Sequence, residues 1–337
     1  MIDLLVAGAG PAGLATALYA ARAGLSVTVV DPRTGPIDKA CGEGLMPGAV
    51  RALNDLGVVL SGQAFGGIRY LDARRSAAAL FPHGAGLGVR RTALHEAMTT
   101  RAVAAGVRFA VGTVTDVSQG HDTVTAAGHQ ARYLVAADGL HSPVRHQLGL
   151  NRPARGPARW GQRQHFSVAS SANLVEVHWA ARSECYVTPI GPGEIGVAVL
   201  SSRRAPFAVQ LEAFPRVLEA LRGATPTTVV RGAGPLRQNA SRRALNRVLL
   251  VGDAAGYVDA LTGEGIAVSL ACARSAVAAI VADRPTDYER AWRRDTRRYR
   301  WITETLLTTR RFAGRSIVPA ASLLPDVFRL AVGQLAR

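Results

Sequence analysis

Three glycines near the start of the chain have a spacing that can hold a phosphate-bearing ligand. Gly8, Gly10 and Gly13 follow an apolar run at residues 2–7 and precede an alanine-rich stretch. Gly8 permits a tight turn, Gly10 lets the backbone approach a pyrophosphate, and Gly13 lets a helix pack closely on a strand. Unpaired N–H groups at the start of such a helix attract negative charge. The spacing therefore predicts a strand, a turn and a helix that bind a dinucleotide.

A second feature strengthens this prediction. Another apolar run, at residues 25–30, ends at Asp31, and a carboxylate there can accept hydrogen bonds from ribose hydroxyls. A glycine fingerprint by itself is weak evidence, because glycine turns before helices are common. Here the strand, glycines, helix, second strand and acid all occur in register. They favour a dinucleotide site over a structural turn, and which dinucleotide it binds stays open at this point.

An aspartate late in the chain stands at the end of another buried strand. Asp253 follows the apolar run at residues 248–251, and a long apolar helix begins after Gly263 and Glu264. An aspartate there can bind a ribityl hydroxyl. The helix N-terminus can hold the negative charge that a reduced flavin accumulates on its pyrimidine edge. Two further stretches place a charged residue at the end of a predicted element: Asp138-Gly139 follows a short strand, and Arg91 begins a helix.

Together these stretches resemble the flavoprotein monooxygenases of the p-hydroxybenzoate hydroxylase fold and their relatives, the geranylgeranyl reductases. The resemblance extends from the first residue to about residue 282. It implies an α/β fold with a Rossmann-like FAD-binding domain, an antiparallel-sheet substrate domain and C-terminal helices. It also implies FAD contacts from Gly8, Gly10, Pro11, Ala12, Gly13, Asp31, Arg91, Asp138, Asp253, Gly263, Glu264, Gly265 and Ile266.

The loop that contains Cys41 and Gly42 resembles the cysteine-glycine loop of the geranylgeranyl reductase branch, which places both residues beside the flavin. Two residues depart from that branch, because Glu43 replaces a usual glycine and Ala260 replaces a proline. Cys41 is either reactive or a small packed residue, since reactivity needs a lowered pKa. Glu43 is either an acid or base beside the ring or a hydrogen-bonding partner within the loop.

Segments 159–166 and 184–200 resemble the small flavoprotein hydroxylases that accompany type III polyketide synthases. On the predicted substrate sheet, His165, Tyr186 and Arg163 could orient or deprotonate a phenol, or could simply be wall or core residues. We therefore name Glu43, His165 and Tyr186 as candidate catalytic residues.

The resemblance implies an FAD-dependent monooxygenase that consumes NADH or NADPH and molecular oxygen. It would hydroxylate a small aromatic polyketide or phenolic lipid through a C4a-hydroperoxyflavin. The alternative is a reductase of isoprenoid double bonds, and a flavin-binding protein without turnover is a third class. Flavin halogenases need an active-site lysine, and Lys39 is the only lysine in the chain, so we consider that interpretation weak.

The pattern of elements predicts a discontinuous organisation. We expect an FAD-binding domain from residues 1–64, 91–155 and 245–283, a substrate domain from 65–90 and 156–244, and a helical segment at 284–337. A helix at 91–105 should turn Leu94, Met98 and Val103 inward. The last segment, at 323–335, is expected to be an amphipathic helix.

Composition limits the classes of partner. Forty basic residues against twenty-four acidic ones give a net charge of +16, yet the arginines are scattered without a nucleic-acid-binding motif. We expect no nucleic-acid binding, and the positive charge still allows weak contact with a membrane surface. Three distant cysteines argue against disulfides and a metal cluster. With no segment for a targeting peptide before Gly8, we expect a cytoplasmic protein.

Overall fold

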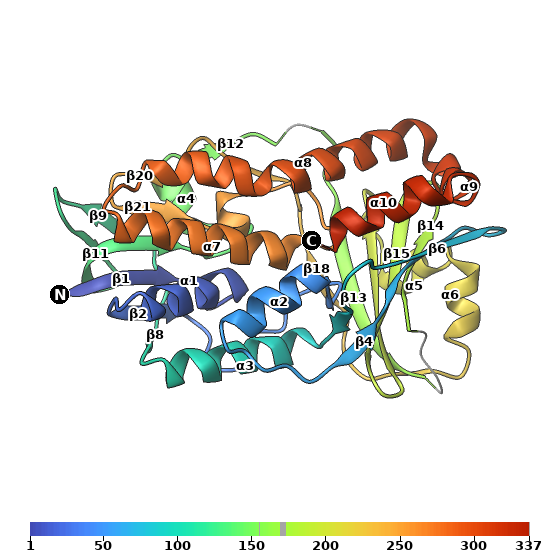
Figure 1. Cartoon of the computed structure of the whole chain (residues 1–337), viewed down its shortest axis with the longest axis horizontal. Helices are drawn as coiled ribbons and strands as arrows, with labels where there is room; N and C mark the ends of the chain where they lie inside the picture. The colour runs from blue at the N-terminus through green and yellow to red at the C-terminus, as the bar shows by residue number, and fades with distance from the viewer. Residues whose placement is uncertain (155, 169–172, 337) are drawn as a thin grey trace.

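A computed structural model describes residues 1–154, 156–168 and 173–336, and its first layer is a mostly parallel sheet (Figure 1). The strand order is β20-β21-β11-β1-β2-β8, and a hairpin of β9 and β10 extends from β11. The five strands from β21 to β8 pair in parallel. The eight strands of the sheet are β1 (Ile2–Ala7), β2 (Val27–Asp31), β8 (Arg108–Val111), β9 (Val117–Gln119), β10 (Val124–Ala126), β11 (His129–Ala136), β20 (Ala244–Leu245) and β21 (Val248–Leu250).

Helices cover this sheet and explain its continuous apolar strands. Helix α1 (Pro11–Arg22) packs on α7 (Gly265–Val281) and on α3 (Arg91–Ala104), while α2 (Pro47–Asp55) packs on α7. A parallel sheet covered by helices buries most of its strand residues, as β1, β2 and β21 do here. In α3, Leu94 and Met98 are buried as expected. Val103 is 58% exposed, so that expectation was wrong, because Ala102 takes the inward position in the last turn.

The second layer is a largely antiparallel sheet of eight strands. Its order is β17-β13-β16-β15-β14-β5-β6, and β18 also pairs with β13. The strands are β5 (Gly67–Leu71), β6 (Ser76–Leu80), β13 (Trp160–Ser167), β14 (Val175–Trp179), β15 (Ser183–Gly191), β16 (Glu194–Ser201), β17 (Thr225–Pro226) and β18 (Arg231–Ala233). Two short helices, α5 (Phe207–Leu211) and α6 (Pro215–Ala220), share one core with this sheet.

Short elements join the two layers. One small sheet contains β3 (Gly44–Leu45), β4 (Gln63–Phe65) and β7 (Gly86–Gly88), and another contains β12 (Asn151–Arg152), β19 (Gln238–Ala240) and β22 (Gly256–Tyr257). Helix α4 (Pro143–Gln147) begins at Ser142, whose hydroxyl accepts a hydrogen bond from the Arg145 N–H. The mixed α/β architecture with C-terminal helices confirms the predicted fold class, while the exact domain bounds stay a prediction.

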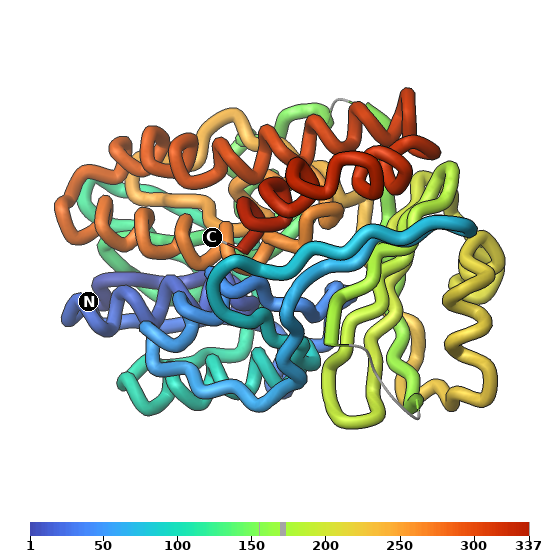
Figure 2. The backbone as a smooth tube through the Cα atoms, turned by 45° about the vertical axis from the view of Figure 1, so that its right-hand side comes forward, coloured from blue at the N-terminus to red at the C-terminus, as the bar shows by residue number. Residues whose placement is uncertain are grey.

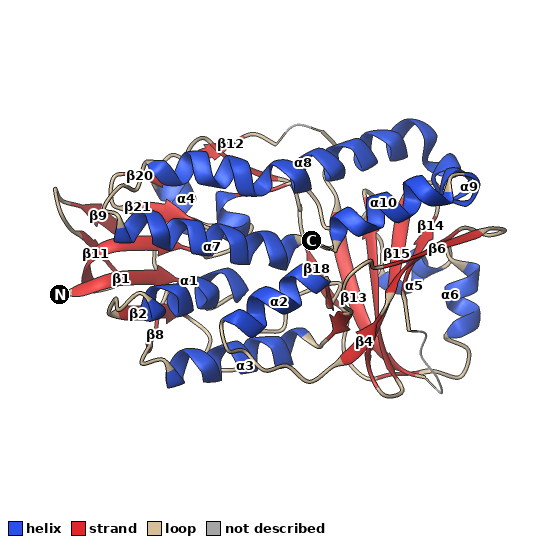
Figure 3. Ribbon diagram, viewed as in Figure 1, coloured by secondary structure: helices blue, strands red, loops and turns tan. Residues whose placement is uncertain are grey.

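The C-terminal helices span both layers, as Figures 2 and 3 show. Helix α8 (Asp287–Ala313) buries Tyr288 and Trp292 in the core of the first layer. Helices α9 (Ile317–Leu323) and α10 (Pro325–Leu335) belong to the core of the second. Among the described residues, no single helix is both long and apolar enough to cross a bilayer. The segments Asp287–Leu323 and Pro325–Leu335, bent by 103°, meet that test only as a pair.

Candidate functional site

One cavity connects the glycine loop of the first layer to the inner face of the second. Eleven of the fifteen residues that we predicted to bind the cofactor line it: Gly10, Pro11, Ala12, Cys41, Gly42, Arg91, Asp138, Asp253, Gly263, Gly265 and Ile266. These residues come from five separate stretches of sequence. The fold therefore brings most of the predicted cofactor residues to one place, while the remaining four lie outside the lining.

The three glycines of the fingerprint have different surroundings. A Cβ atom on Gly13 would lie 1.8 Å from the Gly8 carbonyl oxygen, and one on Gly8 would lie 2.6 Å from the Ala137 oxygen. These two glycines therefore allow close packing of α1 and β11 on the loop. A Cβ on Gly10 would meet nothing nearer than Arg91 Nη2, at 4.0 Å. The open space at Gly10 faces the cavity, where a dinucleotide phosphate would lie.

Polar groups in the lining fit a dinucleotide. Arg91 Nη1 and Asp138 Oδ1 are buried, and neither has a hydrogen-bond partner within the described parts of the chain. The other Asp138 oxygen accepts a hydrogen bond from the Val144 N–H at 3.1 Å. Burying an unpaired donor or acceptor is costly, so these atoms are suited to a phosphate oxygen and a ligand hydroxyl. With the N-terminus of α1 beside them, the residues present fit FAD.

Asp31 lies behind the cavity and not in its lining. Its carboxylate accepts hydrogen bonds from the Ala9 N–H at 2.8 Å and from Arg33 Nε at 2.8 Å. Burial alone would raise its pKa, but hydrogen bonds from Arg33 and Ala9 hold that pKa below the ordinary value. Arg33 lines the cavity in its place. Contact between Asp31 and a ribose therefore stays a prediction, and Arg33 is a charged lining residue that the motif did not reveal.

The flavin end of the cavity contains a second unpredicted cation. Lys39 lines the cavity with Asp253 and lies beside Gly139. Burial lowers the Lys39 pKa, which the negative charge of Asp253 opposes. Burial raises the Asp253 pKa, opposed by Lys39 and Arg91. A lone lysine among arginines, two residues before Cys41, was the available signal for this position.

Glu264 lies under the N-terminus of α7 and outside the lining. One of its carboxylate oxygens accepts a hydrogen bond from Arg298 Nη2 at 2.9 Å, and the other has no partner among the residues described. Burial raises the pKa of this carboxyl to about 7. A carboxyl with this pKa is only partly ionised at neutral pH, which leaves the N–H groups at the start of α7 more available to a negative charge in the cavity.

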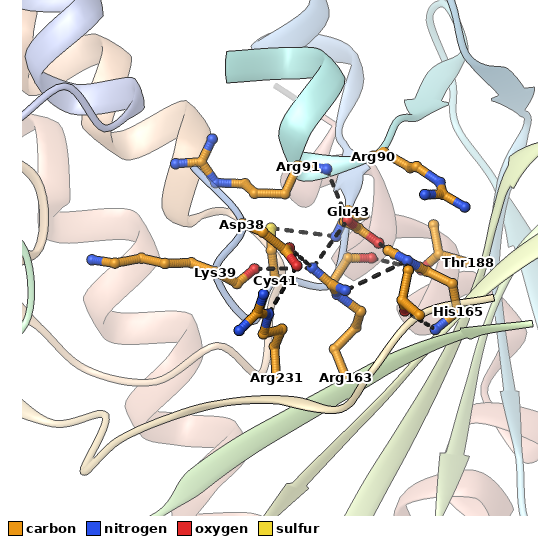
Figure 4. Close-up of polar contacts among 12 residues, drawn as sticks. Asp38, Lys39, Cys41, Glu43, Arg90, Arg91, Arg163, His165, Thr188 and Arg231 are labelled. Atoms are coloured by element: carbon orange, nitrogen blue, oxygen red, sulfur yellow. Dashed lines mark hydrogen bonds and ion pairs between the residues drawn. The ribbon is translucent and has the colours of Figure 1, made fainter. Parts of the chain in front are cut away.

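The Cys41 loop is fixed by a buried polar network, shown in Figure 4. Glu43 Oε2 lies 2.5 Å from His165 Nε2, and Glu43 Oε1 accepts a hydrogen bond from the Arg91 backbone N–H at 2.8 Å. Arg163 lies 3.7 Å from the same carboxylate and also pairs with Asp38. The side chains of Glu43, His165 and Arg163 are at most 3% exposed. The structure thus brings two of the three candidate catalytic residues into direct contact.

This geometry favours a positioning role for Glu43. Its backbone has φ +58°, the left-handed region where a glycine is least strained. The same conformation would suit the glycine that the resemblance to the geranylgeranyl reductase branch implies at this point. Glu43 lines the cavity, whereas His165 and Arg163 do not. Both of its carboxylate oxygens have partners, His165 and the Arg91 N–H, so the geometry favours the hydrogen-bonding interpretation. A role of Glu43 as acid or base beside the flavin and catalysis by His165 both stay predictions.

Cys41 and Tyr186 both line the cavity. Cys41 Sγ accepts a hydrogen bond from the Glu43 N–H at 3.4 Å, and burial raises the pKa of the thiol. A raised pKa disfavours the thiolate at neutral pH, so the structure favours the packing interpretation. Tyr186 donates its hydroxyl hydrogen to the Leu261 carbonyl at 2.7 Å, and burial raises its pKa. Tyr186 is therefore placed as a wall residue and not as a base.

The cavity opens into an apolar chamber against the second sheet. The chamber lining consists of Met46, Ile68, Tyr70, Val175, Val177, Tyr186, Ala198, Leu200, Leu236, Leu261 and Leu335. These side chains bear no charge, in contrast to Arg33, Lys39, Arg91 and Asp253 at the other end. The described residues contain no group of three or more histidine, cysteine or acidic side chains that could hold a metal ion.

Comparison with known proteins agrees with this site. A family model described as FAD binding domain matches residues 1–282. A menaquinone reductase of Mycobacterium tuberculosis is 33% identical over 319 residues, covering 81% of this chain and 75% of that protein. Digeranylgeranylglycerophospholipid reductase 1 of Methanothermobacter thermautotrophicus is 28% identical and covers 91% of this chain and 87% of its own length.

A solved structure shows the same fold. The flavoprotein/dehydrogenase of Cytophaga hutchinsonii superposes with a TM-score of 0.87 at 18% identity, covering 99% of this chain and 92% of that chain. At this identity the likeness concerns the fold alone. The match of the family model and the 33% identical relative therefore identify the family, and the structural likeness independently supports the architecture.

Proposed function

This chain belongs to the FAD-binding domain family of flavin-dependent oxidoreductases, and we propose that it is a monooxygenase that hydroxylates the aromatic ring of a phenolic lipid or aromatic polyketide. NADH or NADPH would be its electron donor. One observation carries the proposal: a single cavity leads from the charged cofactor cradle into a chamber with uncharged, apolar walls. A ring with an alkyl tail fits such a chamber, because apolar walls bind it and exclude water.

The residues of the chain would divide the work along this cavity. Bound FAD would supply the redox chemistry with the nicotinamide donor and molecular oxygen. Arg91 and the N-terminus of α1 would hold phosphate oxygens, and Asp253 would accept a hydrogen bond from a ribityl hydroxyl. The N-terminus of α7 would stabilise negative charge on the ring system. The chamber walls would position the substrate and keep water away from the reacting atoms.

Reduction of isoprenoid double bonds is a second candidate, favoured by a specific observation. The Cys41 loop lines the cavity, and two relatives are named menaquinone reductase and digeranylgeranylglycerophospholipid reductase. The departures at Glu43 and Ala260 from that branch favour the hydroxylase. Both candidates share a substrate with a long apolar part, which is the property that the chamber selects.

Oxygen dependence separates the two candidates. Purified FAD-loaded protein is incubated with alkyl-substituted phenols while NAD(P)H and oxygen consumption are recorded and product masses are measured. We expect coupled consumption and a product that gains one oxygen atom. Turnover that continues without oxygen and yields a product with two added hydrogens would instead establish the reductase.

A variant pair tests the chamber. Ala198 lies in the chamber wall on β16 and is 9% exposed, so Ala198→Phe should fill the chamber and abolish substrate-dependent turnover. FAD binding should be retained. Ala104→Phe, on the exposed end of α3, makes the same change in size away from the cavity and should leave turnover unchanged.

A further inference from the structure

The end of the chain exposes apolar side chains in an ordered way. Leu323, Leu324, Val327 and Leu330 are each at least 56% exposed. Leu323 ends α9, Leu324 lies at the bend before α10, and Val327 and Leu330 are three residues apart on one face of α10. We call these four residues the outer stripe. The opposite face of α10 buries Phe328, Val332 and Leu335 in the core of the second layer. Helix α10 is therefore amphipathic as expected, but it also exposes Val327 and Leu330, and the segment at 323–335 is divided because α9 ends at Leu323.

Two exposed arginines precede the helix that leads to the outer stripe. Arg311 and Arg315 are exposed at the end of α8 and just beyond it, and Phe312 between them is 79% exposed. The acidic residues of this region, Glu304 and Asp326, are paired with Arg237 and Arg329. An exposed apolar stripe with a cationic border matches the chemistry of an anionic lipid surface, where aliphatic groups enter the headgroup region and arginines bind phosphates.

The helix that carries part of the outer stripe packs against the chamber. Leu335 of α10 lines the cavity, and the Phe328 ring lies 4.8 Å from the ring of Tyr70, another lining residue. Helix α10, with a diameter of about 10 Å, therefore lies between the chamber and the exposed side chains of Val327 and Leu330. Figure 1 shows α9 and α10 at the end of the molecule that holds the second sheet.

We propose that the outer stripe and its flanking arginines dock this protein on a bilayer surface rich in anionic phospholipid. The chamber then receives a lipid-tailed substrate from the membrane, and this second statement rests on the proposed function. A second copy of the chain fits the stripe less well, because each copy has a net charge of +16 and the arginines would meet arginines. An anionic surface makes the same charges favourable.

The test is flotation of the FAD-loaded protein with vesicles. Vesicles of phosphatidylglycerol and phosphatidylcholine are compared with vesicles of phosphatidylcholine alone, without substrate. We expect binding only to the anionic vesicles, and weaker binding as salt is raised. The double variant Val327→Asp/Leu330→Asp should bind at least tenfold more weakly. Its FAD absorbance and melting temperature show whether it has folded.

A matched control places the same charges elsewhere. Val103→Asp/Val111→Asp alters two exposed apolar residues on α3 and β8, away from α10, and should float like the native protein. Equal flotation of both double variants, or no binding to anionic vesicles, overturns the proposal. The proposal would also be overturned if the native protein formed dimers but did not bind vesicles, and Val327→Asp/Leu330→Asp abolished those dimers. The stripe would then be a self-association surface.

Activity separates this proposal from the proposed function. A short-chain, water-soluble phenol does not need the membrane, so its turnover should be the same in the native protein and in Val327→Asp/Leu330→Asp. If the native protein turns over the short phenol but does not bind vesicles, only the docking proposal is refuted. Vesicle binding without oxygen-coupled turnover of any phenol refutes only the hydroxylase.

Discussion

Replacing Glu43 by glycine should destabilise the protein, although it relieves backbone strain. At φ +58° a residue with a side chain is strained by about 1 kcal/mol relative to glycine. Glycine is also the residue that the resemblance to the geranylgeranyl reductase branch implies there, so that resemblance alone would predict a neutral or stabilising change. The buried contacts of Glu43 lead to the opposite expectation.

The magnitude follows from the partners that would be left behind. Glu43→Gly removes the carboxylate that contacts His165 and Arg91 N–H and lies near Arg163, all of them buried. Removing one member of a buried ionic network costs about 3–5 kcal/mol. Subtracting about 1 kcal/mol for the relieved strain leaves a net loss of about 2–4 kcal/mol. At about 2 °C for each kcal/mol in a large domain, the melting temperature should fall by about 4–8 °C.

Thermal unfolding of the FAD-loaded protein measures this change, and Ala127→Gly is the control. Ala127 also has a positive φ, 49°, in the turn between β10 and β11, but its methyl group makes no polar contact. Relief of the same strain should therefore leave Ala127→Gly equal to the native protein or more stable by up to about 1 kcal/mol. Opposite signs at the two sites would show that side-chain contacts, and not backbone conformation, decide the effect at Glu43.

A double-mutant cycle with His165→Ala decides whether the contact itself is responsible. The coupling energy between Glu43→Gly and His165→Ala should be at least about 1 kcal/mol, because each variant removes the same hydrogen bond. Additivity within about 0.5 kcal/mol would refute the reasoning. A Glu43→Gly protein as stable as the native one would refute it as well, and would return Glu43 to the candidates for direct chemistry.

Four other substitutions test the cofactor end of the cavity. Asp253→Ala should weaken FAD binding by about tenfold to a hundredfold, measured as loss of bound flavin absorbance, because a charged hydrogen-bond acceptor is removed. Gly10→Ala should weaken FAD binding but leave the stability of the apo protein unchanged. Gly13→Ala should destabilise the apo protein as well, since its Cβ would meet the Gly8 oxygen. Equal effects of the two variants on apo stability would contradict this difference. Glu264 has its pKa raised from 4.5 to about 7, so the folded state binds the extra proton between these values and stability should fall by about 3 kcal/mol as pH rises through that range. Urea unfolding of the apo protein at pH 5 and pH 8 should show this fall, Glu264→Gln should remove most of it, and an unchanged pH dependence in the variant would exclude Glu264 as its source.

Local patterns predicted the cofactor end of the site well. The strand, glycine turn and helix at its start, the strand before Asp253 and the helix after Gly263 are each encoded in short stretches of sequence. Their convergence follows from a parallel sheet, because the carboxyl ends of its strands meet at one edge. Arg33 was not predicted, because nothing in the motif indicates that a neighbouring arginine will pair with Asp31.

Long-range pairing could not be predicted in the same way. Glu43 and His165 are 122 residues apart, and their contact depends on how the second sheet packs against the Cys41 loop. The exposure of Val103 had a different cause. The 91–105 pattern was compatible with either Ala102 or Val103 facing inward, and packing of α3, which contacts α1, selects between them.

The Glu43 contacts also connect the substrate sheet to the cofactor. Glu43 accepts a hydrogen bond from the backbone N–H of Arg91, whose guanidinium group lines the cavity, while its other oxygen contacts His165 on β13. Figure 4 shows the Arg91 and Lys39 side chains extending to the same side of the loop, away from Glu43. Because α3 begins at Arg91, any shift of β13 would pass through Glu43 to the start of that helix. We therefore expect Glu43, which itself lines the cavity, to help position a bound cofactor through Arg91.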